Sequence, residues 1–188
     1  PDEGFMNPGM FIPVFERNGL IADVDRHMWR CACEILADWK SRGIDAFISV
    51  NISPKDFFYM DVVSELKDLV EEFGIDPVSL RIEITETAMT NSSVNMPDIV
   101  NKLRRTGFIV EMDDFGSGYS SLNMLKDMPV DILKIDMVFL GKTDDYKKSK
   151  IILNSIVDMA NNLDMPQITE GVETKEQFEM LRGMGCKL

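Results

Sequence analysis

Phe108-Ile-Val-Glu-Met-Asp-Asp-Phe-Gly-Ser-Gly-Tyr-Ser-Ser-Leu122 is the stretch from which the fold and the site of this chain can be inferred. It opens with an apolar run of strand length, and two adjacent acids, Asp113 and Asp114, follow. At about 4 Å and an effective dielectric constant of about 20, two like charges repel by roughly 4 kcal/mol. The pair therefore indicates a cation or a proton at the strand end. A capping aspartate beside a solvated turn is the simpler alternative for an Asp-Asp pair taken alone.

The residues after the acid pair predict a loop and then a helix. Gly116 and Gly118 permit backbone angles that are closed to other residues, which suits a tight loop. Ser120 begins a run that is typical of the start of a short helix. We therefore expect a strand, an acidic strand end, a glycine loop and a helix in succession.

The composition indicates a soluble globular protein. The 188 residues suit one domain with a sizeable core, since 45 % of them are hydrophobic and 28 % are charged. No apolar run approaches the roughly 18 residues that a membrane span requires, so no membrane contact is expected from this segment. The net charge of −12 argues against a nucleic-acid polymer as partner, because that partner requires a basic surface stripe. A small phosphate ligand held through metal ions is compatible with this charge.

Cysteine and histidine usage limits the kinds of site that the chain can form. The three cysteines Cys31, Cys33 and Cys186 cannot all pair internally, which favours buried thiols in a reducing compartment. A cytoplasmic location is therefore expected for this segment. A membrane tether elsewhere in the complete protein is compatible with that location. His27 is the only histidine, which argues against a histidine-based triad and against a zinc site.

The rest of the chain alternates between predicted strands and helices, a pattern that predicts a parallel sheet with right-handed crossovers. Asp23 is expected to cap the first long helix, and Gly43, Gly74 and Gly107 are expected to end helices. Strands are predicted over residues 46–50, 80–85, 108–112, 131–136 and 167–171, with another beginning at 185–188. Helices are predicted over residues 23–42, 62–73, 97–105, 149–163 and 174–182, with a turn or helix at 11–19 and loops at 1–13 and 142–148.

Five polar residues each lie in or just after the last half of a different predicted strand: Asn51, Glu83, Asp113, Lys134 and Glu170. An active site built from successive strand ends is typical of a (β/α)8 barrel. A doubly wound sheet is the alternative, but it concentrates its chemistry at one switch point and usually carries a glycine-rich phosphate turn. The chain contains no GxGxxG or Walker pattern, so a modified (β/α)8 TIM-like barrel is predicted.

The acids and the asparagine of this set, together with Asp114, offer only hard oxygen ligands. Such a set favours Mg²⁺ or Mn²⁺ over zinc, and several carboxylates at one barrel mouth would repel strongly without a dication. Two close metal ions would suit in-line hydrolysis of a phosphodiester. Lys134 is then expected to hold the nucleophilic water or a phosphate oxygen, and an ion pair with Asp136 is the alternative.

These residues occur in five ordered motifs that resemble the EAL-domain family, whose members are cyclic-di-GMP phosphodiesterases of bacterial signalling proteins. The resemblance covers nearly the whole chain. Ser117 and Thr169 are mild departures, since threonine and alanine are commoner at these positions. The motifs are Val50-Asn-Ile-Ser53, Glu83-Ile-Thr-Glu86, Asp113-Asp-Phe-Gly-Ser-Gly-Tyr-Ser-Ser-Leu122, Leu133-Lys-Ile-Asp136 and Glu170-Gly-Val-Glu173.

The resemblance implies a protein that binds two Mg²⁺ or Mn²⁺ ions and hydrolyses cyclic-di-GMP to linear pGpG. It implies that Lys134 assists the attacking water, that Asp114 binds the second metal ion, and that Glu86 anchors the loop after Asp114. Glu173 is expected to lie behind the ligands and to help fix the 116–118 loop. The metal ligands that the motifs imply are Asn51, Glu83, Asp113 and Glu170.

Residues 1–188 resemble the central part of a single EAL domain. The Glu-Ala-Leu signature, which supplies a metal ligand, and the closing strands are not in the sequence, so a barrel without its first and last strands is expected. The isolated chain is therefore expected to be inactive on cyclic-di-GMP, weak for Mg²⁺ and mobile over residues 115–121. Its open sheet edges favour a homodimer.

Two other functions stay open. A non-catalytic EAL module would bind cyclic-di-GMP or a protein partner as a sensor. The retained acids favour the hydrolase, because a module freed from catalysis has no physical need to gather them. An enolase-like metal enzyme would also place acids at successive strand ends, but it does not account for the Asp-Asp-Phe-Gly-Ser-Gly loop.

Overall fold

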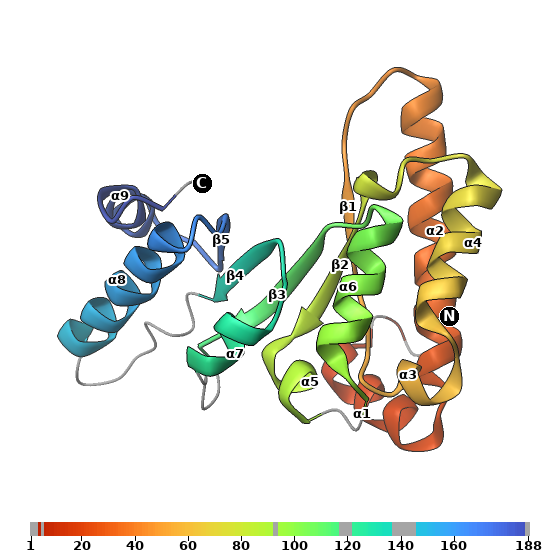
Figure 1. The fold of residues 1–188 in the computed structure, drawn as a ribbon, viewed down its shortest axis with the longest axis horizontal. Coiled ribbons are helices and arrows are strands. Elements are labelled where there is room, and N and C mark those ends of the chain that lie inside the picture. The colour runs from red at the N-terminus through yellow and green to blue at the C-terminus, as the bar shows by residue number, and fades with distance from the viewer. Residues whose placement is uncertain (1–3, 5, 92–93, 117–121, 137–145, 187–188) are drawn as a thin grey trace.

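The computed structural model describes residues 4, 6–91, 94–116, 122–136 and 146–186, and its centre is one sheet of five parallel strands (Figure 1). The strands neighbour one another in chain order, without the reversal that defines a doubly wound sheet. Helices connect successive strands, so the described sheet is the arc of an incomplete TIM-like barrel, which confirms the predicted fold class. The strands are β1 (Ile48–Asn51), β2 (Leu80–Thr85), β3 (Val110–Phe115), β4 (Ile132–Asp136) and β5 (Gln167–Glu170).

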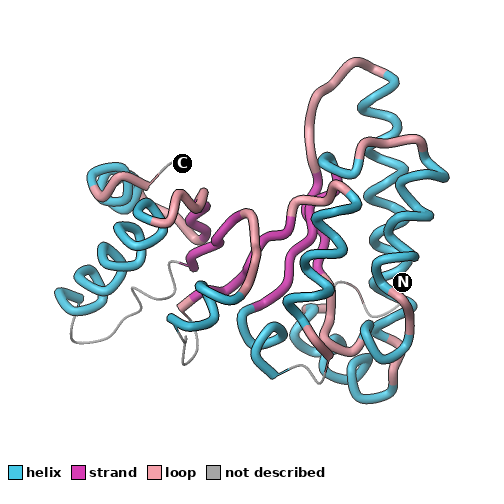
Figure 2. The backbone as a smooth tube through the Cα atoms, viewed as in Figure 1, coloured by secondary structure: helices cyan, strands magenta, loops and turns pink. Residues whose placement is uncertain are grey.

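Long helices flank the sheet, and short helices follow the first three strands (Figure 2). In Figure 1 the short helices α3, α5 and α7 lie toward one end of the sheet, where β1, β2 and β3 end. Among the described helices, none has both the length and the apolar content to cross a membrane. The helices are α1 (Pro8–Asn18), α2 (Ile21–Ser41), α3 (Asp56–Tyr59), α4 (Val62–Phe73), α5 (Glu86–Asn91), α6 (Met96–Thr106), α7 (Leu122–Asp127), α8 (Tyr146–Asn162) and α9 (Lys175–Gly183), with a 3-10 turn η1 (Pro77–Ser79).

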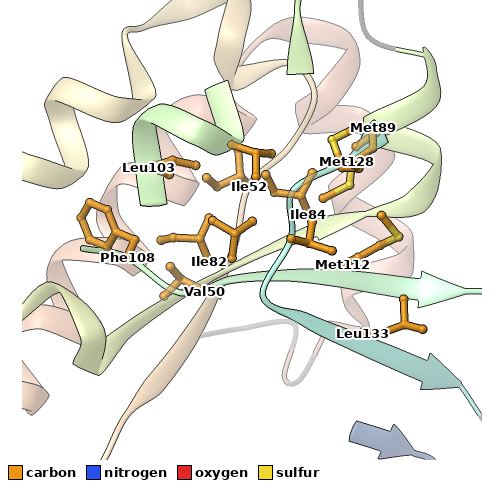
Figure 3. Packing of buried hydrophobic residues seen from close by; sticks show 14 of the residues in the cluster. Val50, Ile52, Ile82, Ile84, Met89, Leu103, Phe108, Met112, Met128 and Leu133 are labelled. Carbon is orange, nitrogen blue, oxygen red and sulfur yellow. The ribbon is translucent and has the colours of Figure 1, made fainter. Parts of the chain in front are cut away.

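Strand alternation gives the sheet an apolar face and a polar face. On β2, Leu80, Ile82 and Ile84 are fully buried in the core, whereas Arg81 and Glu83 point to the opposite face. Figure 3 shows the apolar face, on which side chains of β1, β2 and β3 pack with residues of α5 and α6. The polar face is therefore free to hold a site.

Glycine ends two of the predicted helices where expected. Gly74 follows α4 with φ of 61°, and Gly107 follows α6 with φ of 107°, both in the left-handed region that glycine tolerates. Pro97 lies in the first turn of α6, where its missing N–H costs no hydrogen bond within the helix. Thr174 caps α9 through a capping box with Gln177, so this helix begins one residue later than predicted.

The predicted N-terminal loop is wrong from residue 8 onward. The Asn7 side chain accepts a hydrogen bond from the Gly9 N–H, and Pro8 takes the first helical position, so these residues open α1. Asp23 does not cap α2, which already begins at Ile21. Residues 146–148, predicted as loop, open α8, while 142–145 lie outside the described residues.

Two strands are displaced from their predicted limits. β1 begins at Ile48 rather than at residue 46, because its partner strand β2 begins at Leu80, with which Ile48 is paired. Phe47 stacks instead on the Arg81 guanidinium, whose carbon lies 3.4 Å from the ring centroid. β3 begins at Val110 and continues through both aspartates to Phe115. The helix predicted from Ser120 is described from Leu122, and the strand predicted over 185–188 lies partly outside the described residues.

We predict that Ile84→Ala lowers the free energy of unfolding by about 2–5 kcal/mol, because Ile84 is fully buried and alanine would leave a cavity. Urea unfolding measures this change. Ile151→Ala is the control, since Ile151 is 66 % exposed and its truncation should change stability by less than about 0.5 kcal/mol. Equal losses in the two variants would contradict the assignment of the core.

Candidate active site

Lys134 lies at the centre of three carboxylates from three other strands. Its Nζ lies 2.6 Å from Glu83 Oε1, 2.8 Å from Glu170 Oε1 and 3.2 Å from Asp113 Oδ1. The Lys134 side chain is only 6 % exposed, so this ammonium is almost removed from solvent. The ends of β2, β3, β4 and β5 therefore meet at one point. A local pair with Asp136 alone would not give these three contacts.

The pKa values of this cluster reflect burial and charge together. Burial alone would lower the pKa of Lys134, but hydrogen bonds to Glu170 and Glu83 raise it above its ordinary value and keep the ammonium charged. Burial raises the pKa of Glu83, and its hydrogen bond to Lys134 opposes that shift. The site thus holds its acids close together with one permanent cation between them.

Asp113 and Asp114 lie on either side of an irregularity in β3. The register to β4 shifts between Met112 and Phe115, and Asp114 has a φ of 56°. The Asp114 N–H donates to Asp113 Oδ1 at 3.0 Å, and the Asp114 side chain is exposed. Partial burial, followed by the charges of Asp113 and Asp136, raises the pKa of Asp114.

Asn51 ends β1 directly opposite Glu83 in the sheet register, and its side chain is exposed. The backbone carbonyl oxygen of Asn51 accepts a hydrogen bond of 3.0 Å from Trp29 Nε1 of α2, which fixes the backbone at this strand end. Three of the four predicted ligands thus meet at Lys134, and the fourth lies beside Glu83.

The two glutamates predicted to support the glycine loop have different surroundings. Glu86 is buried, and its Oε2 accepts a hydrogen bond of 3.0 Å from the Gly116 N–H, the contact that a loop-anchoring role requires. Glu173 is exposed on the turn after β5, and its N–H donates to the Gln177 side chain. In the described part of the chain, the Glu173 carboxylate makes no hydrogen bond or ion pair. Residues 117–121 lie outside the described residues.

A second charged pair, missed in the sequence, lies beneath the cluster on the polar face. Arg81 Nη1 donates to Glu111 Oε1 at 3.0 Å, and Ser49 Oγ donates to Glu111 Oε2 at 3.1 Å. Glu111 is 1 % exposed, and Phe47 covers the guanidinium. The signal that could have revealed the pair is the spacing, since Arg81 and Glu111 each precede a predicted ligand by two residues and so share its strand face.

The donor set fits a hard divalent cation by its chemistry. Glu83, Asp113 and Glu170 present carboxylate oxygens from three strands to a single positive charge. Within the residues that the structure describes, no three acidic, histidine or cysteine side chains are arranged as a metal-ion site. Here the Lys134 ammonium takes the central position among these oxygens, and it satisfies the same electrostatic requirement.

The family model that matches this chain is the EAL domain, over residues 1–188. The chain is 34 % identical over 186 residues to the signaling protein YkoW of Bacillus subtilis, covering 99 % of this chain and 23 % of YkoW. It is also 34 % identical over 188 residues to MucR of Pseudomonas aeruginosa, a bifunctional diguanylate cyclase/cyclic di-GMP phosphodiesterase, covering 99 % of this chain and 27 % of MucR. The chain thus spans about a quarter of the length of these curated relatives.

The fold is similar to that of the PaMucR phosphodiesterase, solved in complex with c-di-GMP. The TM-score is 0.92 at 32 % sequence identity, and the match covers 100 % of this chain and 76 % of that one.

We predict that Arg81→Met destabilises the chain by about 3–5 kcal/mol, because it leaves the buried Glu111 carboxylate without its cation. Chemical unfolding measures the loss. Arg30→Met is the matched control, since the Arg30–Glu72 pair is exposed and its removal should cost less than about 1 kcal/mol. A small loss for Arg81→Met would show that Glu111 does not depend on Arg81.

Proposed function

This chain belongs to the EAL domain family, and from that premise we propose that the protein of which it is a part hydrolyses cyclic di-GMP to linear pGpG in bacterial second-messenger signalling. The observation that carries the proposal is the meeting of Glu83, Asp113 and Glu170 at Lys134. MucR, which is named a cyclic di-GMP phosphodiesterase, and the c-di-GMP complex of PaMucR support the substrate. The sequence of 188 residues is proposed to be the central part of one EAL domain.

We assign Mg²⁺ or Mn²⁺, two ions, as the cofactor of this site. When bound, two such ions would polarise a phosphoryl oxygen and lower the pKa of a bound water. Asp114, exposed beside Asp113, is proposed to contact the second ion. The proposed ligands of the first are Asn51, Glu83, Asp113 and Glu170.

The remaining proposed roles belong to Lys134 and to two glutamates near the glycine loop. Lys134 keeps its proton, so it can hold the attacking water or a phosphate oxygen by donating a hydrogen bond. Glu86 holds the start of the glycine loop through Gly116 and thereby fixes the backbone directly after β3, two residues beyond Asp114. Glu173 is proposed to act on the same loop.

A non-catalytic module that binds the nucleotide or a protein partner is the second candidate. It would share the fold, but it would not need Lys134 buried among three acids, an arrangement that costs desolvation energy. The density of acids on the polar face therefore favours hydrolysis. An enolase-like enzyme is set aside, because the family is established.

The cellular setting is proposed to be the cytoplasm. Cys31, Cys33 and Cys186 are free thiols, which suits a reducing compartment. A homodimer and the absence of a nucleic-acid polymer as partner stay predictions.

We predict that Lys134→Ala and Asp113→Asn, each made in the complete protein, reduce pGpG formation by roughly 100-fold or more, because the first removes the donor to the reacting group and the second a ligand charge. The assay follows release of pGpG from cyclic di-GMP with Mg²⁺ or Mn²⁺ present. Lys102→Ala is the control, since Lys102 is an exposed lysine paired with Asp98. Wild-type turnover in either site variant would refute the role assignment.

Nucleotide binding separates the two candidate functions. A hydrolase converts bound cyclic di-GMP to pGpG once Mg²⁺ is supplied, whereas a sensor binds it and releases it unchanged. Binding without any turnover of the complete protein, in Mg²⁺ and in Mn²⁺, would therefore favour the sensor.

A further inference from the structure

Asp56, at the start of α3, is fully buried and closes the turn that follows β1. Its N–H donates to the Ser53 carbonyl oxygen at 3.0 Å, and its Oδ2 accepts from the Ser53 N–H at 2.9 Å. The other carboxyl oxygen, Oδ1, is buried, and no donor among the described residues bonds to it. A buried carboxylate oxygen without a donor is costly, so the group that satisfies Oδ1 has to be identified.

Asp25 of α2 is a candidate, because its carboxyl lies within hydrogen-bonding reach of Asp56 and of the Ser53 N–H. Two ionised carboxylates would repel in this buried position. If one proton is shared, however, Oδ1 of Asp56 becomes a donor to Asp25, and both groups are satisfied. The pair then forms a hydrogen bond between α2 and the turn at residues 53–56.

The same helix holds the other end of this segment. Trp29 lies four residues after Asp25, on the same face of α2, and its Nε1 donates to the Asn51 carbonyl oxygen. Ile52, between the two anchors, is buried in the core. Helix α2 therefore holds the segment 51–56 at both of its ends. The indole of Trp29 contacts residue 51, and the carboxyl of Asp25 contacts Asp56.

We propose that Asp25 and Asp56 are positioning residues that share one proton, hold the turn after β1 against α2, and thereby place the Asn51 side chain at the proposed metal site. This inference rests on the proposed function only for what Asn51 binds. Loss of the shared proton would leave two repelling carboxylates and loosen the turn.

The charges around the pair favour the protonated form. Burial, followed by the charge of Asp25, raises the pKa of Asp56 to about 8, and burial raises the pKa of Asp25 as well. The half-buried Glu16 of α1 adds a further negative charge near Asp25. Arg26 of α2 opposes the shift of Asp56, but its guanidinium also pairs with Glu65 of α4.

The sign of the pH effect follows from the raised pKa. Because folded Asp56 binds its proton more tightly than the unfolded chain does, this contribution to stability is fully present below the ordinary pKa of 3.8 and is lost as the pH rises through about 8. The placement of Asn51 should weaken over the same upper range.

The test is Asp56→Asn in the complete protein. The asparagine oxygen can still accept from the Ser53 N–H, and its amide can donate to Asp25 at every pH. Mg²⁺ affinity, by calorimetry without nucleotide, and the thermal unfolding midpoint are measured at about pH 6.5 and about pH 9, on either side of the titration. Between these values the affinity of the wild type relative to the variant should fall by about threefold or more, and its midpoint should fall further than that of the variant.

Two comparisons complete the experiment. Asp68→Asn on the exposed face of α4 should follow the wild type at both pH values, and Asp25→Asn should reduce the pH dependence as Asp56→Asn does. If Asp56→Asn and Asp25→Asn both keep the wild-type pH dependence, the shared proton is refuted. Absence of Mg²⁺ binding and of pGpG formation at any pH would refute the proposed function instead, while the unfolding midpoints would still decide on the carboxyl pair.

Discussion

The ammonium of Lys134 is the constraint on which the rest of the site depends. Three carboxylates from β2, β3 and β5 lie within 3.2 Å of its nitrogen. Without a positive charge at this point, the ends of these strands would repel one another. The parallel sheet brings them together because every strand ends at the same edge, and the chain order of the strands places Lys134 on β4, between the acids of β3 and β5. Fold and site therefore require each other.

A second ion pair, between Arg81 and Glu111, leaves Lys134 to the acids of the proposed site. Glu83 and Glu111 are direct neighbours in the register of β2 and β3, and like charges in such positions destabilise a sheet. Each acid has its own cation, since Glu83 contacts Lys134 and Glu111 contacts Arg81. Phe47 covers Arg81 and so limits the solvent that would weaken the lower pair. The polar face thus carries stacked ion pairs, and Lys134 stays with the acids of the proposed site.

The sequence was sufficient for the fold class and for the order of helices and strands, because alternation, glycine stops and five spaced motifs are local signals. It was not sufficient for contacts that depend on register and on packing between distant segments. Arg81 and Glu111 belong to different strands, and only their alignment brings a guanidinium to a carboxylate. Asp25 and Asp56 have the same limitation, because nothing near either residue marks it as half of a carboxyl pair. Phe47 was assigned to a strand, because nothing near it in the sequence shows that the partner strand begins only opposite Ile48.

The tandem acids explain why β3 is irregular. In a regular strand Asp113 and Asp114 would point to opposite faces of the sheet. Asp114 would then point toward the apolar core, and Phe115 toward the polar face. The shift between Met112 and Phe115 avoids this, because Phe115 returns to the core at 2 % exposure while Asp114 stays exposed. The positive φ of Asp114 costs on the order of 1–3 kcal/mol. Burying an unpaired carboxylate in the core would cost considerably more, so the strained backbone is the more stable way to keep two neighbouring acids at one strand end.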